Sequence, residues 1–148
     1  KKAYKEYKYM YYSKYDINKD GIKELLIVFR NYKKPKGVRF GGSDYAIYTY
    51  YDDKVKLADS IFCGGGSGET CMVYSGEKYI LRLSHGGYDL NCYTKYKLLK
   101  DGSLKVIGTC SVNGTDYMID NKTVSKLEYE KEIESYVDKQ AVKMEFYK

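Results

Sequence analysis

Oxygen-bearing side chains at alternate positions single out one segment of the chain for chemistry. Asp16, Asn18 and Asp20 recur at every second residue, Gly21 follows them, and Glu24 comes three residues later. Ca²⁺ is a hard cation that takes about six to eight oxygen ligands. Alternate Asp and Asn side chains around a tight turn supply several of these ligands from one short loop. The spacing therefore predicts a calcium site.

The remaining positions of the loop fit the same prediction. Gly21 permits the sharp bend that such a loop needs, and the carbonyl oxygen of Ile22 would then point inward. Glu24 would close the ring, directly or through water. We thus predict metal ligands at five residues: Asp16, Asn18, Asp20, Ile22 and Glu24.

A plain polar turn is the competing interpretation, because Asn, Asp and Gly favour turns for backbone reasons of their own. Two features weigh against it. A turn does not require acids or amides at alternate positions, and the ordinary turn signal at residues 100–103 lacks them. Carboxylates so close together also repel one another unless a cation, or Lys19 and Lys23, compensates. We expect a modest affinity, in the roughly micromolar to millimolar span of sensors and extracellular modules.

Two elements must position this loop. Tyr4, Tyr7, Tyr11 and Tyr15 recur at spacings of three and four residues, with charged residues between them, which predicts a short amphipathic helix before the loop. The run from Leu25 to Phe29 is unbroken and apolar, as in a central strand covered on both faces. Metal binding would then hold the first helix against the sheet.

The rest of the sequence predicts a sheet followed by a helix. Between residues 44 and 119, strand-like runs rich in Tyr, Val, Ile and Thr alternate with turn signals, which indicates an antiparallel meander. Ser125 and Glu128 form a capping box that starts a C-terminal helix. We therefore expect an α+β fold, with an N-terminal and a C-terminal helix packed on a meander sheet, in a single domain over residues 1–148.

Four cysteines and a single histidine, without a Cys-x-x-Cys pair, disfavour structural zinc. An even number of cysteines in a small domain favours disulfides and an oxidising compartment. Cys63 and Cys71 flank a glycine-rich stretch, and Cys92 and Cys110 fall nearly opposite each other if residues 100–103 turn a hairpin. We predict these two pairings; the alternative is free buried thiols.

Composition and charge limit the cellular locations and the classes of partner that we expect. The net charge of +6 comes from scattered lysines, with only three arginines among 26 basic residues, so we expect no nucleic-acid partner. No apolar run is long enough to cross a membrane. The sequence begins with Lys1 rather than Met, so any export signal or lipid anchor would lie upstream of it. We expect the domain to lie outside the cell.

The loop also resembles known segments. Its series Asp16, Asn18, Asp20, Gly21 is similar to the nine-residue loops of integrin-type repeats and to the first half of dockerin loops, which usually carry Asp where this chain has Glu24. Residues 15–27, together with residues 117–129, resemble segments of uncharacterised secreted or lipid-anchored α+β domains of gut-dwelling Gram-positive bacteria. The resemblance implies an extracellular location and a calcium loop, and it supplies no activity.

We therefore expect a noncatalytic extracellular module that binds calcium and recognises a surface protein or a glycan. A flat face rich in tyrosine, such as one carrying Tyr48 and Tyr50, would suit this role. One alternative is a small secreted hydrolase that uses acidic residues, and another is an inhibitor or immunity-like binding domain. We interpret His85, the one histidine, as a turn residue rather than a catalytic base. The acids considered for the hydrolase are Asp44, Asp52, Asp53 and Asp89.

Overall fold

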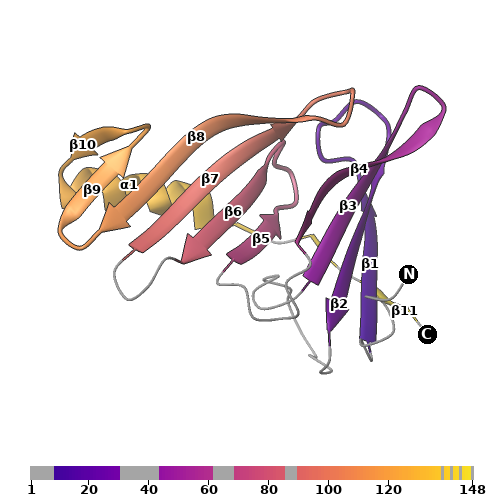
Figure 1. Ribbon diagram of the computed structural model, residues 1–148, viewed down its shortest axis with the longest axis horizontal. Helices are drawn as coiled ribbons and strands as arrows, with labels where there is room; N and C mark the ends of the chain where they lie inside the picture. Colours follow the sequence, from indigo (N-terminus) through magenta and orange to yellow (C-terminus); the bar gives the residue numbers. More distant parts are fainter. Residues whose placement is uncertain are drawn as a thin grey trace.

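The computed structural model describes residues 9–30, 44–61, 69–85, 90–137, 139–140, 142–143 and 145–147. Within these ranges the chain forms two antiparallel sheets and one helix (Figure 1). The elements in chain order are β1 (Tyr9–Tyr15), β2 (Glu24–Arg30), β3 (Asp44–Tyr51), β4 (Lys54–Ile61), β5 (Glu69–Val73), β6 (Ile80–His85), β7 (Leu90–Leu98), β8 (Leu104–Asn113), β9 (Asp116–Ile119), β10 (Lys122–Val124), α1 (Lys126–Val137) and β11 (Glu145–Tyr147).

The first sheet has five strands in the order β11-β1-β2-β3-β4. The apolar strand β2 lies in its middle, as its unbroken hydrophobic run predicts. The second sheet has six strands in the order β10-β9-β8-β7-β6-β5, so each strand pairs with its neighbour in the sequence. In Figure 1 the two sheets lie side by side, and α1 packs behind the far end of the six-stranded sheet.

The predicted α+β class is wrong, because no helix precedes the loop in the described chain. Residues 9–15 form strand β1, which pairs with β2 over its whole length, from Tyr9 opposite Arg30 to Tyr15 opposite Glu24. The same tyrosines also fit a period of two, since Tyr9, Tyr11 and Tyr15 share one face of a strand. Tyrosine favours strands, and a strand partner is available in β2, so pairing overrides the helical spacing. Residues 1–8, where the predicted helix begins, lie outside the described chain.

The C-terminal helix begins where the capping box predicts. The backbone N–H of Ser125 donates to Oε2 of Glu128 at 2.9 Å, and the backbone N–H of Glu128 donates to Oγ of Ser125 at 3.3 Å. Helix α1 then buries Tyr129 and Tyr136 against the six-stranded sheet. Leu127, in the first turn of α1, is 76% exposed.

Two hydrophobic cores cover opposite faces of the six-stranded sheet. The first lies between the two sheets and joins Leu26, Val28 and Ile47 to Val73 and Ile80. The second lies under α1, where the helix tyrosines pack on residues of β5, β6 and β8, namely Met72, Leu81 and Cys110. The six-stranded sheet is therefore shared between the cores and holds the five-stranded sheet and the helix in one structure.

The β7–β8 turn approaches the five-stranded sheet closely at Gly102, which has a φ of +82°. A Cβ atom there would lie 2.8 Å from Cγ2 of Thr49. We expect Gly102→Ala to lower the free energy of unfolding by about 2–4 kcal/mol, from the left-handed backbone and the clash together. Gly76→Ala is the control, because Gly76 also has a positive φ, +87°, but has open space around it. Chemical denaturation that gave equal losses for both variants would contradict the close packing.

Candidate metal centre

The predicted calcium loop connects β1 to β2 at one end of the five-stranded sheet. Its backbone takes the left-handed conformation at Lys19 (φ 61°) and at Gly21 (φ 94°). These two residues fold the chain tightly enough for side chains before and after them to face each other. Gly21 suits its position because a Cβ atom there would strain the backbone.

The carboxylate of Asp16 is fixed by the backbone on the far side of the loop. Its Oδ1 accepts a hydrogen bond from the N–H of Asp20 at 3.1 Å, and its Oδ2 accepts one from the N–H of Gly21 at 2.9 Å. The remaining lone pairs of this carboxylate stay available. These two hydrogen bonds hold the Asp16 carboxylate in place on the inner side of the loop.

Asn18 and Asp20 complete the inner side of the loop. The side-chain oxygen of Asn18 accepts from the N–H of Asp20 at 3.1 Å, and its Nδ2 donates to Oδ2 of Asp20 at 3.0 Å. Oδ1 of Asp20 accepts from the N–H of Ile22 at 2.9 Å. Within the described chain, neither Asp16 nor Asp20 forms an ion pair with a lysine. Backbone N–H groups donate to both carboxylates instead, an arrangement that a plain polar turn also forms.

Glu24 lies on the inner side of the sheet, away from solvent. It is fully buried, and its two carboxylate oxygens accept hydrogen bonds from the N–H of Ile17 at 2.8 Å and from Oγ1 of Thr49 at 3.0 Å. Burial raises the pKa of this carboxyl. Glu24 therefore ties the loop to β3. Among the described residues, no cluster of three or more His, Cys, Asp and Glu side chains converges as a metal site.

The donor set of the loop fits a calcium ion in chemistry and falls short in number. Asp16, Asn18, Asp20 and the carbonyl of Ile22 would supply about four oxygens, whereas calcium takes six to eight. Direct ligation by Glu24 stays a prediction, and its hydrogen bonds to Ile17 and Thr49 would have to rearrange. A site with two carboxylates and open positions for water belongs at the weak end of the calcium range, at about 10⁻⁴–10⁻³ M.

A cavity of about 350 Å³ opens beside the loop. It lies between Asn18, Lys19 and Asp20 of the loop and the end of the β7–β8 hairpin, where Lys97 and Lys100 line it. The loop also contacts the turn after β5, since the hydroxyl of Tyr15 accepts hydrogen bonds from Lys19 Nζ at 2.8 Å and from the N–H of Gly76 at 2.7 Å. Residues from three separate hairpins thus surround the candidate site.

The described cysteines do not pair with one another. Cys92 lies opposite Ser111 and Cys110 lies opposite Tyr93, so the two cysteines project from opposite faces of the sheet. A Cys92–Cys110 bridge, which stays a prediction, would need a one-residue shift in register. Cys71 is a buried thiol whose pKa burial raises to about 12, and its predicted partner Cys63 lies outside the described residues.

The residues considered for catalysis are spread over the molecule. Asp44 opens β3, whereas Asp52 and Asp53 follow its other end in an exposed turn. His85 is exposed, and its Nδ1 contacts the side-chain oxygen of Asn91. Asp89 lies outside the described residues. The described members of this group therefore do not come together at one site.

A polar cluster between the two sheets escaped the sequence analysis. Arg82 on β6 pairs with the buried carboxylate of Asp59 on β4, donating from Nε to Oδ2 at 3.2 Å and from Nη2 to Oδ1. The hydroxyl of Tyr45 donates to Oδ2 of Asp59 at 2.8 Å, and burial raises the pKa of Tyr45. Arg82 was a signal, because it is the one charged residue in the apolar start of β6. Asp59 gave none, because β4 also carries two lysines and a serine.

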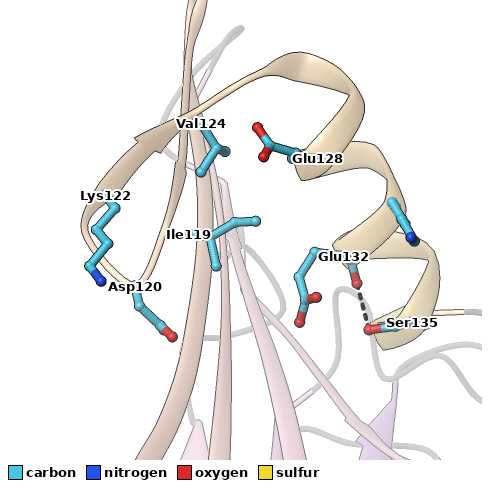
Figure 2. A pocket seen from close by; sticks show the side chains of 8 residues that line it. Ile119, Asp120, Lys122, Val124, Glu128, Glu132 and Ser135 are labelled. Carbon is cyan, nitrogen blue, oxygen red and sulfur yellow. Dashed lines mark hydrogen bonds between the residues drawn. The ribbon is translucent and has the colours of Figure 1, made fainter.

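A groove of about 580 Å³ separates α1 from the β9–β10 hairpin. Figure 2 shows Glu128 and Glu132 projecting from the helix and Ile119 and Val124 from the strands opposite. Glu128 is committed to the helix cap, where hydrogen bonds from Ser125 lower its pKa. Asp120 and two lysines also line the groove, which makes its charge mixed.

The outer face of the five-stranded sheet carries exposed apolar side chains on β3 and β4. Tyr48 lies opposite Leu57 and Tyr50 lies opposite Val55, so these four share one face. Val55 is 71% exposed, Leu57 52% and Tyr50 47%. This face is the tyrosine-bearing surface that the spacing of Tyr48 and Tyr50 predicts.

Comparison with known proteins gives no match: no protein family, no curated protein and no solved structure is similar to this chain. In the described ranges, no helix combines the length and the apolarity needed to cross a membrane.

Proposed function

We propose that this chain is a noncatalytic extracellular binding module whose β1–β2 loop binds calcium. One observation carries the proposal: the carboxylate of Asp16 is fixed by two backbone N–H groups, facing Asp20, and neither acid is ion-paired in the described chain. Calcium would relieve the repulsion between these carboxylates. Its structural role would be to fasten the end of β1 to the start of β2, in place of the helix anchoring that the sequence led us to expect.

A binding role is supported by the exposed face of the five-stranded sheet. A contiguous group of Tyr and aliphatic side chains at the surface is typical of a site that contacts a protein or a glycan. An extracellular location agrees with a weak calcium site, because modules outside the cell work in the range of about 10⁻⁴–10⁻³ M. An inhibitor or immunity-like domain would use the same kind of surface and would differ in its partner alone.

The hydrolase alternative has one observation in its favour, the carboxylates Asp120, Glu128 and Glu132 around the groove beside α1. Glycoside hydrolysis needs two carboxyl groups free to act on opposite sides of one bond. Glu128 is held by the helix cap, and Oδ1 of Asp120 accepts from the N–H of Thr109 at 2.8 Å. This commitment of two of the three acids favours binding over catalysis.

Thermal unfolding tests the proposal. With about 10 mM Ca²⁺ and a dissociation constant of about 10⁻⁴–10⁻³ M, we expect about 1.4–2.7 kcal/mol of stabilisation, or a rise in Tm of about 3–10 °C. Magnesium should give a smaller rise, because it demands octahedral geometry and keeps its waters. Asp20→Ala should abolish the calcium effect, whereas Asp101→Ala, in an ordinary turn, should preserve it. An equal rise in Asp20→Ala would contradict the loop as the site.

A further inference from the structure

Strand β4 leaves one edge of the five-stranded sheet without a partner. It is the last strand in the order β11-β1-β2-β3-β4, and it pairs with β3 alone. Within the described ranges, no backbone–backbone hydrogen bond apart from the ladder with β3 reaches residues 54–61. A free edge of this kind carries a row of backbone N–H and C=O groups that can pair with a further strand.

The other sheet edges of the described chain are shorter or covered. β10 and β11 have three residues each. β5 has five, and the carbonyl oxygen of Val73 at its end accepts a hydrogen bond from the N–H of Val142 at 2.9 Å. Short length and cover are two means by which proteins prevent unwanted strand pairing, and β4, with eight residues, has neither. Its edge is therefore the best placed of the four to accept a strand from another molecule.

The register limits this pairing to the half of β4 next to the hairpin turn. Residues 54–57 lie opposite residues 48–51 of β3 without interruption, and a register shift follows before Asp59. A bulge of this kind disrupts the ladder. Four residues suffice for a short added strand, since β10 pairs with β9 over three. In Figure 1 the tip of the β3–β4 hairpin projects away from the body of the molecule, at the upper right.

The outer face beside this edge is apolar. Val55 and Leu57 are exposed on it, and the exposed ring of Tyr50 lies opposite Val55. In an added strand, every second side chain would lie beside Val55 and Leu57 and would remove apolar surface from water. The edge therefore favours β-branched or aromatic residues at alternate positions of its partner.

The opposite face beside this edge is basic. Lys54 and Lys56 occupy its alternate positions, and neither forms an ion pair in the part of the chain that the structure describes. Nζ of Lys56 contacts two neutral groups, the ring of Tyr51, with 4.4 Å to the centroid, and the carbonyl oxygen of Asp101 at 3.4 Å. The Asp101 carboxylate accepts hydrogen bonds from Ser103. Acidic side chains at the remaining positions of an added strand would therefore pair with these lysines.

The same lysines disfavour a second copy of this chain as the occupant. An antiparallel pair centred on this segment, with the apolar side chains of both copies on one face, places Lys54 opposite Lys56 or Lys56 opposite itself. Like charges directly opposite each other destabilise a strand pair. The net charge of +6 adds repulsion between whole molecules. An acidic segment of another protein fits this edge better.

We propose that residues 54–57 of β4 bind an extended peptide segment of a partner protein as an added strand, with apolar and acidic side chains alternating along that segment. The backbone ladder would supply affinity, and the alternation would supply specificity. The inference rests on the proposed binding role of this face and names the class of its partner. It does not depend on the calcium loop.

Fluorescence polarisation with the labelled hexapeptide EVEIEV, on the intact chain, tests this inference. We expect saturable binding, and binding about tenfold weaker for KVKIKV, in which the charges are reversed. EVEIEV that is N-methylated at every residue keeps its side chains but loses its backbone donors, so it should not bind. Equal binding of the three peptides, or none by EVEIEV, would overturn the inference.

Amide hydrogen exchange locates the bound peptide. EVEIEV should slow the exchange of residues 54–57 and leave that of β10 and β11, the other short edges, unchanged. Protection confined to another strand would place the peptide elsewhere and overturn the inference.

A charge reversal in the protein tests the role of the lysines. Lys54→Glu with Lys56→Glu should reverse the preference, so that KVKIKV binds about tenfold more tightly than EVEIEV. Lys126→Glu with Lys131→Glu, on α1, changes the net charge equally and should keep the original preference. An unchanged preference in the β4 variant would contradict pairing at this edge.

A neutral oligosaccharide, cellotriose, separates this inference from the proposed binding role. If cellotriose binds the face of Tyr50 and Val55 and EVEIEV does not, the face is a glycan site and the peptide inference is wrong. If neither binds, the binding role of this face fails with it. Calcium titration tests the loop separately from both.

Discussion

Replacing Arg82 with alanine is expected to lower the free energy of unfolding by about 3–5 kcal/mol, because the change leaves a buried carboxylate without its partner. The side chain of Asp59 is only 5% exposed and receives hydrogen bonds from Arg82 and from Tyr45. The side chain of Arg82 is itself 25% exposed, so water can replace part of its contribution. We therefore expect a loss near the lower end of this range, measured by chemical denaturation.

Two controls test the cause of this loss. Lys126 and Glu130 form an ion pair on α1 whose side chains are 65% and 53% exposed, so Lys126→Ala should cost less than about 0.5 kcal/mol. The double change Asp59→Leu with Arg82→Met removes both charges and should recover much of the stability. A double variant as unstable as the sum of the single changes would contradict the explanation by an unpaired buried charge.

Tyr136→Ala is expected to cost a similar amount, about 3–5 kcal/mol, by emptying the space between α1 and the six-stranded sheet. The residue is 2% exposed and belongs to the second core. The centroid of its ring lies 3.4 Å from Nζ of Lys95, which is a cation–π contact. Its hydroxyl is close to Gly108, where an added Cβ atom would lie 3.0 Å from it. Denaturation monitored by circular dichroism would report the loss.

Leu127 provides the matched control on the same helix. It is a large apolar residue that is 76% exposed, so Leu127→Ala should change stability by no more than about 0.5 kcal/mol. Similar losses in the two variants would mean that α1 packs with a different face on the sheet. A small loss for Tyr136→Ala alone would mean that the second core does not depend on the helix.

The sequence predicted elements best where local chemistry sets them. Ser125 and Glu128 satisfy each other's backbone N–H groups whatever the rest of the chain does, so the capping box located the start of α1. Asp52 and Asp53 turn the β3–β4 hairpin with positive φ angles of 55° at both residues, as a tight hairpin turn requires. These features need no knowledge of distant residues.

Predictions that depended on partners far along the chain were less secure. The spacing of Tyr11 and Tyr15 fits a helix and a strand equally well, and the pairing with β2 and β11 decides for the strand. Cys92 and Cys110 were placed nearly opposite by counting from the β7–β8 turn. In the observed register the two cysteines are offset by one residue, so their side chains lie on opposite faces of the sheet.

In the candidate site too, some features are set within one loop and others depend on residues far along the chain. The meeting of Asp16, Asn18 and Asp20 could be predicted from spacing alone, because one loop holds all three residues. The burial of Glu24 could not, since its hydrogen bond with Thr49 joins residues on two different strands. The cavity beside the loop depends on Lys97 and Lys100, which only the folded hairpin brings there.

Direct calorimetric titration of calcium into the protein, after treatment with chelator, tests the central claim most directly. We predict saturable binding of one ion per chain with a dissociation constant of about 10⁻⁴–10⁻³ M, and its loss in Asp16→Ala. Lys126→Ala, a change on the exposed side of α1, should bind as the unchanged protein does. The absence of saturable heat in the unchanged protein, or equal binding by Asp16→Ala, would contradict a calcium site in the β1–β2 loop.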